Sequence, residues 1–117
     1  MKVSDYRKLG LNCAESVISA YNEDHGTSIP MSIASGMGGG FSSGSLCGAI
    51  AASVLVIGFV KGRDNADVSN EASAYTRIFM DKIQEKYGTN ICRELKAKGV
   101  TCMEIEDFAY EVLNTVI

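Results

Sequence analysis

The sequence predicts an all-α fold, a compact helical bundle with one nearly all-apolar helix at its centre. Three observations support this prediction. Apolar residues recur at helical spacing along most of the chain, and no long segment alternates apolar and polar residues as a strand does. The chain has one proline in 117 residues, and proline disrupts helix interiors. Residues 49–60 read AIAASVLVIGFV, which is typical of a helix that is buried all round.

Capping residues predict where the first helices begin and end. Asn12 is a preferred N-cap, and Glu15 stands three positions further on, so a helix is expected to begin at position 13. Gly26 suits the left-handed conformation that ends a helix. Pro30 favours the first turn of a short helix that runs through Ser35.

The middle of the chain combines a glycine-rich segment with the most apolar helix. Residues 36–45 contain five glycines in ten positions, which is incompatible with a stable helix and indicates a loop. The apolar helix is expected to follow over about 45–61.

Three further helices are expected after this one. A stripe of apolar residues predicts a long helix that Gly88 ends: Val68, Ala72, Tyr75, Ile78, Phe79 and Ile83. A short helix is expected over 91–97. A last helix has a predicted inner face of Ile105, Phe108, Ala109, Val112, Leu113 and Val116. No repeat or domain boundary is visible, so residues 1–117 are expected to form one domain.

Composition excludes several classes of protein. Hydrophobic residues make up 46% and charged residues 21%, values typical of globular domains and not of disordered chains. The net charge of -3 gives no sign of the basic face of a nucleic-acid binder. The apolar stretch would rise only about 18 Å as a helix, too short for a membrane. The segment MKVSDYRKLG has no export signal, and we expect a cytoplasmic location.

Four cysteines are the candidate catalytic residues, with either a redox or a metal-ligating role: Cys13, Cys47, Cys92 and Cys102. No C-x-x-C spacing is present. Each cysteine is expected in the first turn of a helix, where the positive end of the helix dipole favours the thiolate. Cys47 follows the glycine-rich loop, whose exposed amides add to this effect, and is expected to be the most activated.

Several roles for these thiols stay open. Four thiolates are able to ligate one zinc ion or an iron–sulfur cluster. The same residues are also able to form two reversible disulfides. The ten-residue gap makes Cys92 and Cys102 the easiest pair to join, and Cys13 with Cys47 is then the other pair. Each cysteine alone would more simply be a small core residue.

A second hypothesis is a helical module that binds a small molecule or an anion. The glycine-rich loop leads into a helix N-terminus, an arrangement suited to anions. The candidate cofactor-binding residues are Gly38, Gly39, Gly40, Gly44 and Gly48. The favoured interpretation is simpler, since glycines allow a loop to pass close to neighbouring helices. The phosphate-binding pattern G-x-x-x-x-G-K-[ST] is absent.

A third hypothesis is an oligomerising helical protein. A helix that is apolar almost all round is hard to cover in a chain of this length. A homo-oligomer is therefore expected, in which a second copy covers part of this helix. A redox partner protein would accompany the first hypothesis, and no nucleic acid or membrane partner is expected.

The pattern of these residues resembles the C-GCAxxG-C-C family of redox-active four-cysteine proteins. The resemblance rests on Asn12-Cys13-Ala14, Ser35-Gly36-Met37-Gly38-Gly39-Gly40, Cys47-Gly48-Ala49, Cys92-Arg93-Glu94-Leu95 and Cys102. The resemblance covers nearly the whole chain. It implies redox chemistry at the four cysteines. Ala52 stands where the family motif has glycine, and a small change in helix spacing is expected there.

Overall fold

Six α-helices and two short helical segments form the fold in the computed structural model, which describes residues 2–117. The α-helices are α1 (Val3–Lys8), α2 (Cys13–His25), α3 (Gly48–Lys61), α4 (Ala72–Tyr87), α5 (Cys92–Ala97) and α6 (Cys102–Val116). A 3₁₀ segment, η1 (Met31–Met37), and a wider turn, η2 (Gly40–Gly44), lie between α2 and α3. The all-α prediction is confirmed for the residues that the structure describes.

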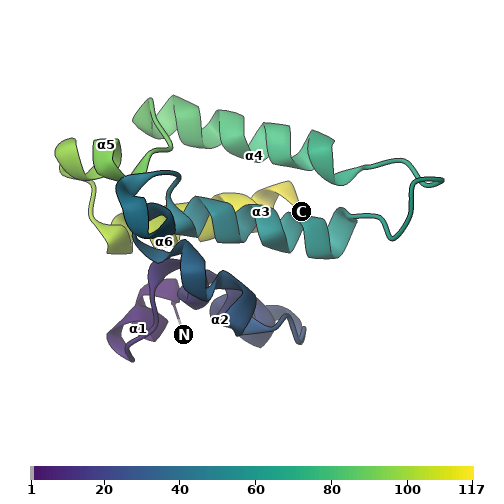
Figure 1. Cartoon of the computed structure of the whole chain (residues 1–117), viewed down its shortest axis with the longest axis horizontal. Coiled ribbons are helices and arrows are strands. Elements are labelled where there is room, and N and C mark those ends of the chain that lie inside the picture. The colour runs from purple at the N-terminus through teal and green to yellow at the C-terminus, as the bar shows by residue number, and fades with distance from the viewer. Residues whose placement is uncertain (1) are drawn as a thin grey trace.

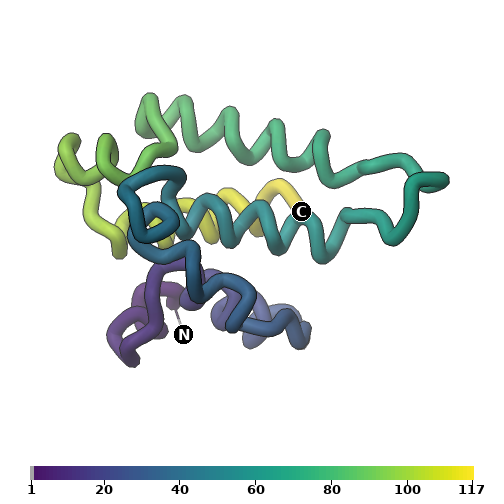
Figure 2. Tube along the Cα trace, viewed as in Figure 1, coloured from purple at the N-terminus to yellow at the C-terminus, as the bar shows by residue number. Residues whose placement is uncertain are grey.

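Helix α3 lies between α2 and α4, and α6 runs along a further side of it (Figure 1). Figure 2 shows the same path as a tube, with α1 and α2 folded against one side and α4 along the other. Eight of the fourteen residues of α3 are buried, because neighbours cover it on several sides. Its C-terminal turn is less covered, and Phe59 and Val60 are exposed there.

The core is formed by side chains from all four long helices. The largest fully buried apolar residues are Phe79, Ile18, Ile50, Ile57, Ile83 and Leu113. Burying one such side chain stabilises a fold by about 1.5–3 kcal/mol. The contacts of α3 with α2, α4 and α6 therefore hold the bundle together.

The predicted caps of α2 and the predicted end of α4 are confirmed. The Asn12 side chain accepts a hydrogen bond from the Glu15 N–H, and Glu15 accepts one from the Asn12 N–H. Thr101 caps α6 in the same way by accepting from the Glu104 N–H. Gly26 and Gly88 take the left-handed conformation where α2 and α4 end.

Four features differ from the sequence prediction. Helix α1 was not expected, since six residues carry little periodic signal. Helix α3 begins at Gly48 rather than at Ser45, because Ser45 and Leu46 pair with another segment instead. Val68 and Ile78, predicted to face the core, are about half exposed. Helix α4 begins only at Ala72 and buries Phe79, Ile83 and Tyr87 on its inner side.

The glycine-rich loop is a compact turn with a left-handed backbone. Gly39, Gly40 and Gly44 have positive φ, and so do Phe41 and Ser42. Such φ values are uncommon for residues other than glycine. The turn closes through a hydrogen bond of 2.8 Å from the Ser45 N–H to the Gly40 carbonyl, and it leads the chain into α3.

Within residues 2–117, no helix combines the length and the apolar character that crossing a membrane requires.

Candidate functional site

Two of the four cysteines are held beside each other by a short antiparallel bridge between Leu46 and Ile91. The Cys47 N–H donates to the Asn90 carbonyl at 2.9 Å, and the Cys92 N–H donates to the Ser45 carbonyl at 2.7 Å. In this antiparallel pairing Cys47 lies opposite Asn90 and Cys92 lies opposite Ser45, so the two cysteines are diagonal neighbours across the bridge. The bridge thus fixes the starts of α3 and α5 next to each other.

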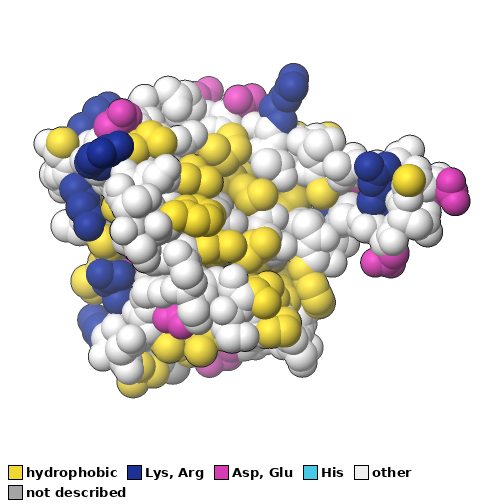
Figure 3. Space-filling view, viewed as in Figure 1, with side chains coloured by type: hydrophobic (Ala, Val, Ile, Leu, Met, Phe, Trp, Pro, Cys, Tyr) yellow, Lys and Arg dark blue, Asp and Glu magenta, His cyan; other side chains and the backbone are white. Residues whose placement is uncertain are grey.

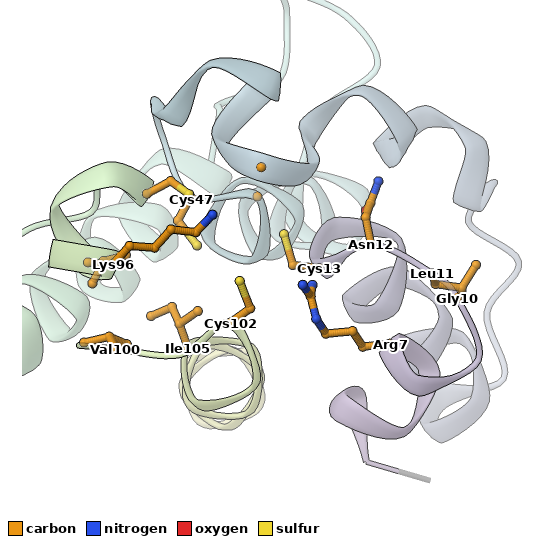
Figure 4. Close-up of a pocket in the computed structure, with 14 residues that line it drawn as sticks. Arg7, Gly10, Leu11, Asn12, Cys13, Cys47, Lys96, Val100, Cys102 and Ile105 are labelled. Carbon is orange, nitrogen blue, oxygen red and sulfur yellow. The ribbon is translucent and has the colours of Figure 1, made fainter. Parts of the chain in front are cut away.

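All four cysteines line a single cavity of about 300 Å³. Cys13, Cys47 and Cys92 are buried, and Cys102 is partly exposed. Figure 4 shows the sulfur atoms of Cys13 and Cys102 directed into this space from α2 and α6. Cysteines separated by up to 89 positions in the sequence therefore meet at one cavity. Their irregular spacing in the sequence does not predict this.

The predicted placement of the cysteines at helix starts is confirmed. Cys13, Cys92 and Cys102 are the first residues of α2, α5 and α6, and Cys47 is the N-cap of α3. The unpaired N–H groups and the dipole of a helix N-terminus favour negative charge nearby. The cavity is therefore surrounded by groups that stabilise anionic sulfur.

The expectation that Cys47 is the most activated thiol is wrong for the protein without a bound group. Burial raises the pKa of the Cys47 thiol to about 11, although the N–H groups of Ile50 and Ala49 act in the opposite direction. Burial likewise raises the pKa of Cys13, and the N–H of Gly39 opposes it. Loss of hydration outweighs the helix N-terminus at both sulfurs.

Two basic side chains reach the cavity from opposite sides. Arg7 comes from α1 and Lys96 from α5 (Figure 4). Arg7 interacts electrostatically with Cys102 and Cys13. Arg7 also donates from Nη1 to Glu106 Oε1 at 3.0 Å. These cations further favour a negatively charged occupant or charged thiolates.

Glu106 is fully buried, and its Oε2 atom has no hydrogen-bond partner among the described residues. Burial raises the pKa of this carboxyl to about 7, while Arg7 acts in the opposite direction. Sequence reasoning did not single out Glu106 or Arg7. The signal was present, because Cys102, Glu106 and Ala109 recur at spacings of four and three and thus share one helix face.

The glycines bring backbone close to the cysteines. A Cβ on Gly48 would lie 2.7 Å from Cys13 Sγ and 2.6 Å from the Met37 carbonyl oxygen. A Cβ on Gly40 would lie 2.6 Å from the Cβ of Cys92. Real Cβ atoms do not approach this closely, so larger residues at Gly48 and Gly40 would displace the walls of the cavity.

The other candidate glycines occupy different surroundings. A Cβ on Gly38 would collide with the side chain of Asn12 at 2.7 Å, and Gly44 lies beside the stem of Arg93. Gly39 and Gly48 line the cavity itself. These contacts favour the interpretation that the glycines allow the loop to pack closely against neighbouring helices. An interaction of the five glycines with a cofactor stays a prediction.

The thiols do not form a single-ion site as they stand. Within residues 2–117, no three Cys, His, Asp or Glu side chains are grouped so that they could hold one metal ion. All four cysteines are free thiols. Ala52 is fully buried in the core and is not among the residues that line the cavity, so its methyl group does not occupy the cavity.

The fold and site define a class of protein, an all-α domain in which four helix starts bring four cysteines to one cavity. Residues 11–116 match the family model described as "Putative redox-active protein (C_GCAxxG_C_C)". The chain belongs to this family, as its resemblance to the motif predicted. Searches of curated proteins and of solved structures returned no significant match.

Proposed function

We propose that this protein is an electron-transfer protein whose four cysteines together ligate one iron–sulfur cluster. The observation that carries the proposal is that thiols from four separate helix starts line one cavity. Cys13, Cys47, Cys92 and Cys102 would be the ligands, in the four-cysteine set that such clusters commonly use. When bound, a cluster of this kind supplies reversible one-electron oxidation and reduction.

The spacing of the thiols favours a cluster over a single zinc ion. Zinc needs four ligands at about 2.0–2.3 Å around one point, and no three potential ligands among the described residues are grouped in that way. A cluster offers several iron atoms, so thiolates that stand apart around a cavity of about 300 Å³ suit it better.

The electrostatics of the cavity support metal ligation. With raised pKa values, Cys13 and Cys47 are neutral thiols near pH 7 in the protein alone, and neutral thiols are poor nucleophiles. A metal centre deprotonates the thiols that bind it. The helix N-termini, Arg7 and Lys96 then offset the negative charge of four thiolates.

A second candidate is a reversible disulfide between Cys13 and Cys47. The observation that favours it is the position of Cys13 Sγ against Gly48, the residue that follows Cys47. Forming the Sγ–Sγ bond would release two protons and two electrons to an oxidised dithiol carrier. The raised pKa of Cys47 slows its attack on a disulfide, so this role ranks second.

The test is a native mass of protein purified without air, repeated after denaturation, with analysis of iron, zinc and acid-labile sulfide. Iron and sulfide in comparable amounts, both lost on denaturation, are the expected result. One zinc ion and no sulfide would contradict the cluster. A ligand-free mass that is lower by two hydrogens per disulfide would replace the cluster with dithiol chemistry. A ligand-free mass that stays fully reduced even after an oxidised dithiol is added would contradict both candidates.

Single serine variants of the four cysteines separate the two candidates further. If all four cysteines ligate one cluster, each variant should hold much less iron than the unaltered protein. If only Cys13 and Cys47 react with each other, Cys92→Ser and Cys102→Ser should still become lighter by two hydrogens on oxidation, as the unaltered protein does. These two variants thus serve as internal controls for the first two.

A further inference from the structure

The mouth of the four-cysteine cavity lies in a basic part of an acidic protein. The chain has a net charge of -3, yet the charged residues of 7–12 are Arg7 and Lys8, both basic. Between 91 and 101, three of the four charged residues are basic, namely Arg93, Lys96 and Lys98. Several Lys and Arg side chains lie along the left edge of the surface in Figure 3, the end where Figure 1 draws α5 and α1.

The acidic side chains near this end are already engaged within the protein. Glu94, the one acidic residue of 91–101, accepts a hydrogen bond from the Thr89 hydroxyl. Glu104 accepts a hydrogen bond from the Tyr87 hydroxyl at 2.9 Å. The basic residues Lys8, Arg93 and Lys96 are exposed. Arg7 is paired with Glu106, and Lys8 lies 3.9 Å from Asp5 in a solvent-exposed pair. An exposed pair of this kind contributes little free energy, so Lys8, Arg93 and Lys96 still present positive charge to a partner.

Exposed apolar side chains accompany the basic residues. Leu9 follows Lys8 directly and is 71% exposed, and Met103 follows Cys102 and is 40% exposed. Val100 and Leu11 line the cavity between these two segments. Apolar contacts at the centre with charged residues around them are characteristic of protein–protein interfaces.

We propose that this basic surface, defined here by Arg7, Lys8, Leu9, Arg93, Lys96 and Met103, is the docking site of an acidic electron-carrier protein. The inference rests on the proposed electron-transfer function, because it names the partner class of that same site. Each encounter would exchange one electron, so one protein is oxidised by the electron that reduces the other. Complementary charge would speed the encounter and select the partner.

The spread of the charges favours a protein over a small anion. Arg7 and Lys96 line the cavity, whereas Lys8 and Arg93 lie outside its lining. A single small anion in the cavity would not need the outer two. Cys102, the partly exposed cysteine, precedes Met103 in this surface and gives the partner its closest approach to the thiols.

The test is binding of two carrier proteins of opposite charge, an acidic [2Fe–2S] ferredoxin and the basic cytochrome c, measured by calorimetry at low and high salt. We expect the ferredoxin to bind and cytochrome c not to bind. The affinity for ferredoxin should fall as the salt concentration rises, because salt screens exposed charges. The double variant K8E/R93E should weaken ferredoxin binding by about tenfold or more at low salt.

The matched control is R77E/K82E, which makes the same change in net charge on α4. Arg77 and Lys82 are exposed and lie outside the docking surface, so this variant should bind like the unaltered protein. Equal weakening by both variants would overturn the proposal in favour of net charge alone. Failure of the ferredoxin to bind, or binding of cytochrome c in its place, would also overturn it.

Iron content and binding are measured separately in this experiment. Protein that lacks iron but binds ferredoxin through Lys8 and Arg93 would contradict only the cluster. Protein that holds a cluster but does not bind ferredoxin would contradict only the docking surface.

Discussion

At the scale of single residues, Cys47 shows how burial and a helix N-terminus compete at one sulfur. The position before the first turn of α3 favours the thiolate, and the N–H groups of Ile50 and Ala49 act in that direction. Removal from water nevertheless raises the pKa to about 11. At the start of α3 the Cys47 thiolate is therefore expected to become stable once a cation is bound, because burial outweighs the helix N-terminus in the protein alone.

This balance predicts slow alkylation of Cys47 in reduced, iron-free protein. At pH 8 we expect iodoacetamide to modify Cys47 about a hundredfold more slowly than an ordinary thiol of pKa about 8.5. Cys102, which is partly exposed, should react earlier. Peptide mass spectrometry over time measures both rates. In denaturant Cys47 should react at the ordinary rate, and fast modification in the folded protein would contradict the raised pKa.

Glu106 predicts a pH dependence of stability. Its pKa is about 7 in the folded protein and about 4.3 in an unfolded chain, so the folded state holds this proton to higher pH. The contribution to the free energy of unfolding is thus complete below about pH 4.3. It is lost as the pH rises through about 7, by on the order of 3 kcal/mol.

The control for this prediction is Glu106→Gln, which cannot ionise and still accepts from Arg7. Other carboxylates change stability with pH in both proteins, so the informative quantity is the difference between the two unfolding free energies. Relative to the glutamine variant, the unaltered protein should lose stability as the pH rises from 4.5 to 7. A constant difference across this range would show that Glu106 titrates normally.

At the scale of elements, two glycines of α3 predict opposite effects of the same substitution. Gly48→Ala would place a Cβ 2.6 Å from the Met37 carbonyl oxygen and 2.7 Å from Cys13 Sγ. We expect it to lower the free energy of unfolding by about 1–3 kcal/mol and to reduce iron content. Gly58→Ala meets no atom within 4 Å and should stabilise the helix by about 0.5–1 kcal/mol. Denaturant unfolding compares the two variants.

The outcome that would contradict this comparison is equal stability of Gly48→Ala and Gly58→Ala. Normal stability of Gly48→Ala with reduced iron would instead separate the role of Gly48 at the cavity from its role in packing. Both variants keep the charge and the helix length unchanged, so differences between them reflect local contacts.

The starts of α2 and α6 could be predicted from the sequence because capping chemistry is local. Asn12 with Glu15, and Thr101 with Glu104, satisfy backbone N–H groups within three residues, and such patterns are visible in one dimension. Helix α1 was missed because its six residues depend on packing against α2 and α6. Ile78 was misplaced because α4 buries only a narrow side, which its apolar stripe overstates.

The candidate site was only partly predictable, because local patterns are visible in the sequence and contacts between distant segments are not. The four cysteines and their helix-start positions followed from local patterns. Their meeting at one cavity depends on the Leu46–Ile91 bridge, which joins segments 45 residues apart. The Arg7–Glu106 pair joins α1 to α6, and no local rule indicates such a contact. The raised pKa of Cys47 depends on burial, which spacing alone does not give.

At the scale of the whole molecule, the two ends of the bundle differ in how they are held. Helices α2, α3, α5 and α6 all begin at the cavity, whereas α4 begins at the far end of α3 (Figure 1). The first residues of α4 are largely exposed, and its buried residues are Phe79, Ile83 and Tyr87. A group bound in the cavity would therefore tie four helix starts together and leave the start of α4 untouched.

This arrangement predicts where hydrogen exchange changes when the bound group is removed by a chelator and an oxidant. Segments with few buried contacts open with low free energy in any state, so the first two turns of α4 should exchange fast both before and after removal. Amides in the first turns of α2, α3, α5 and α6 should exchange faster after removal, because ligation stabilises only the closed state. Mass spectrometry of peptides around Cys13, Cys47, Cys92 and Cys102 measures this change, and the peptide around Ala72 is the internal control. A change spread evenly over the chain would mean that the bound group stabilises the fold as a whole. No change at the four cysteine peptides would mean that the group lies elsewhere, and the cluster assignment would then fail.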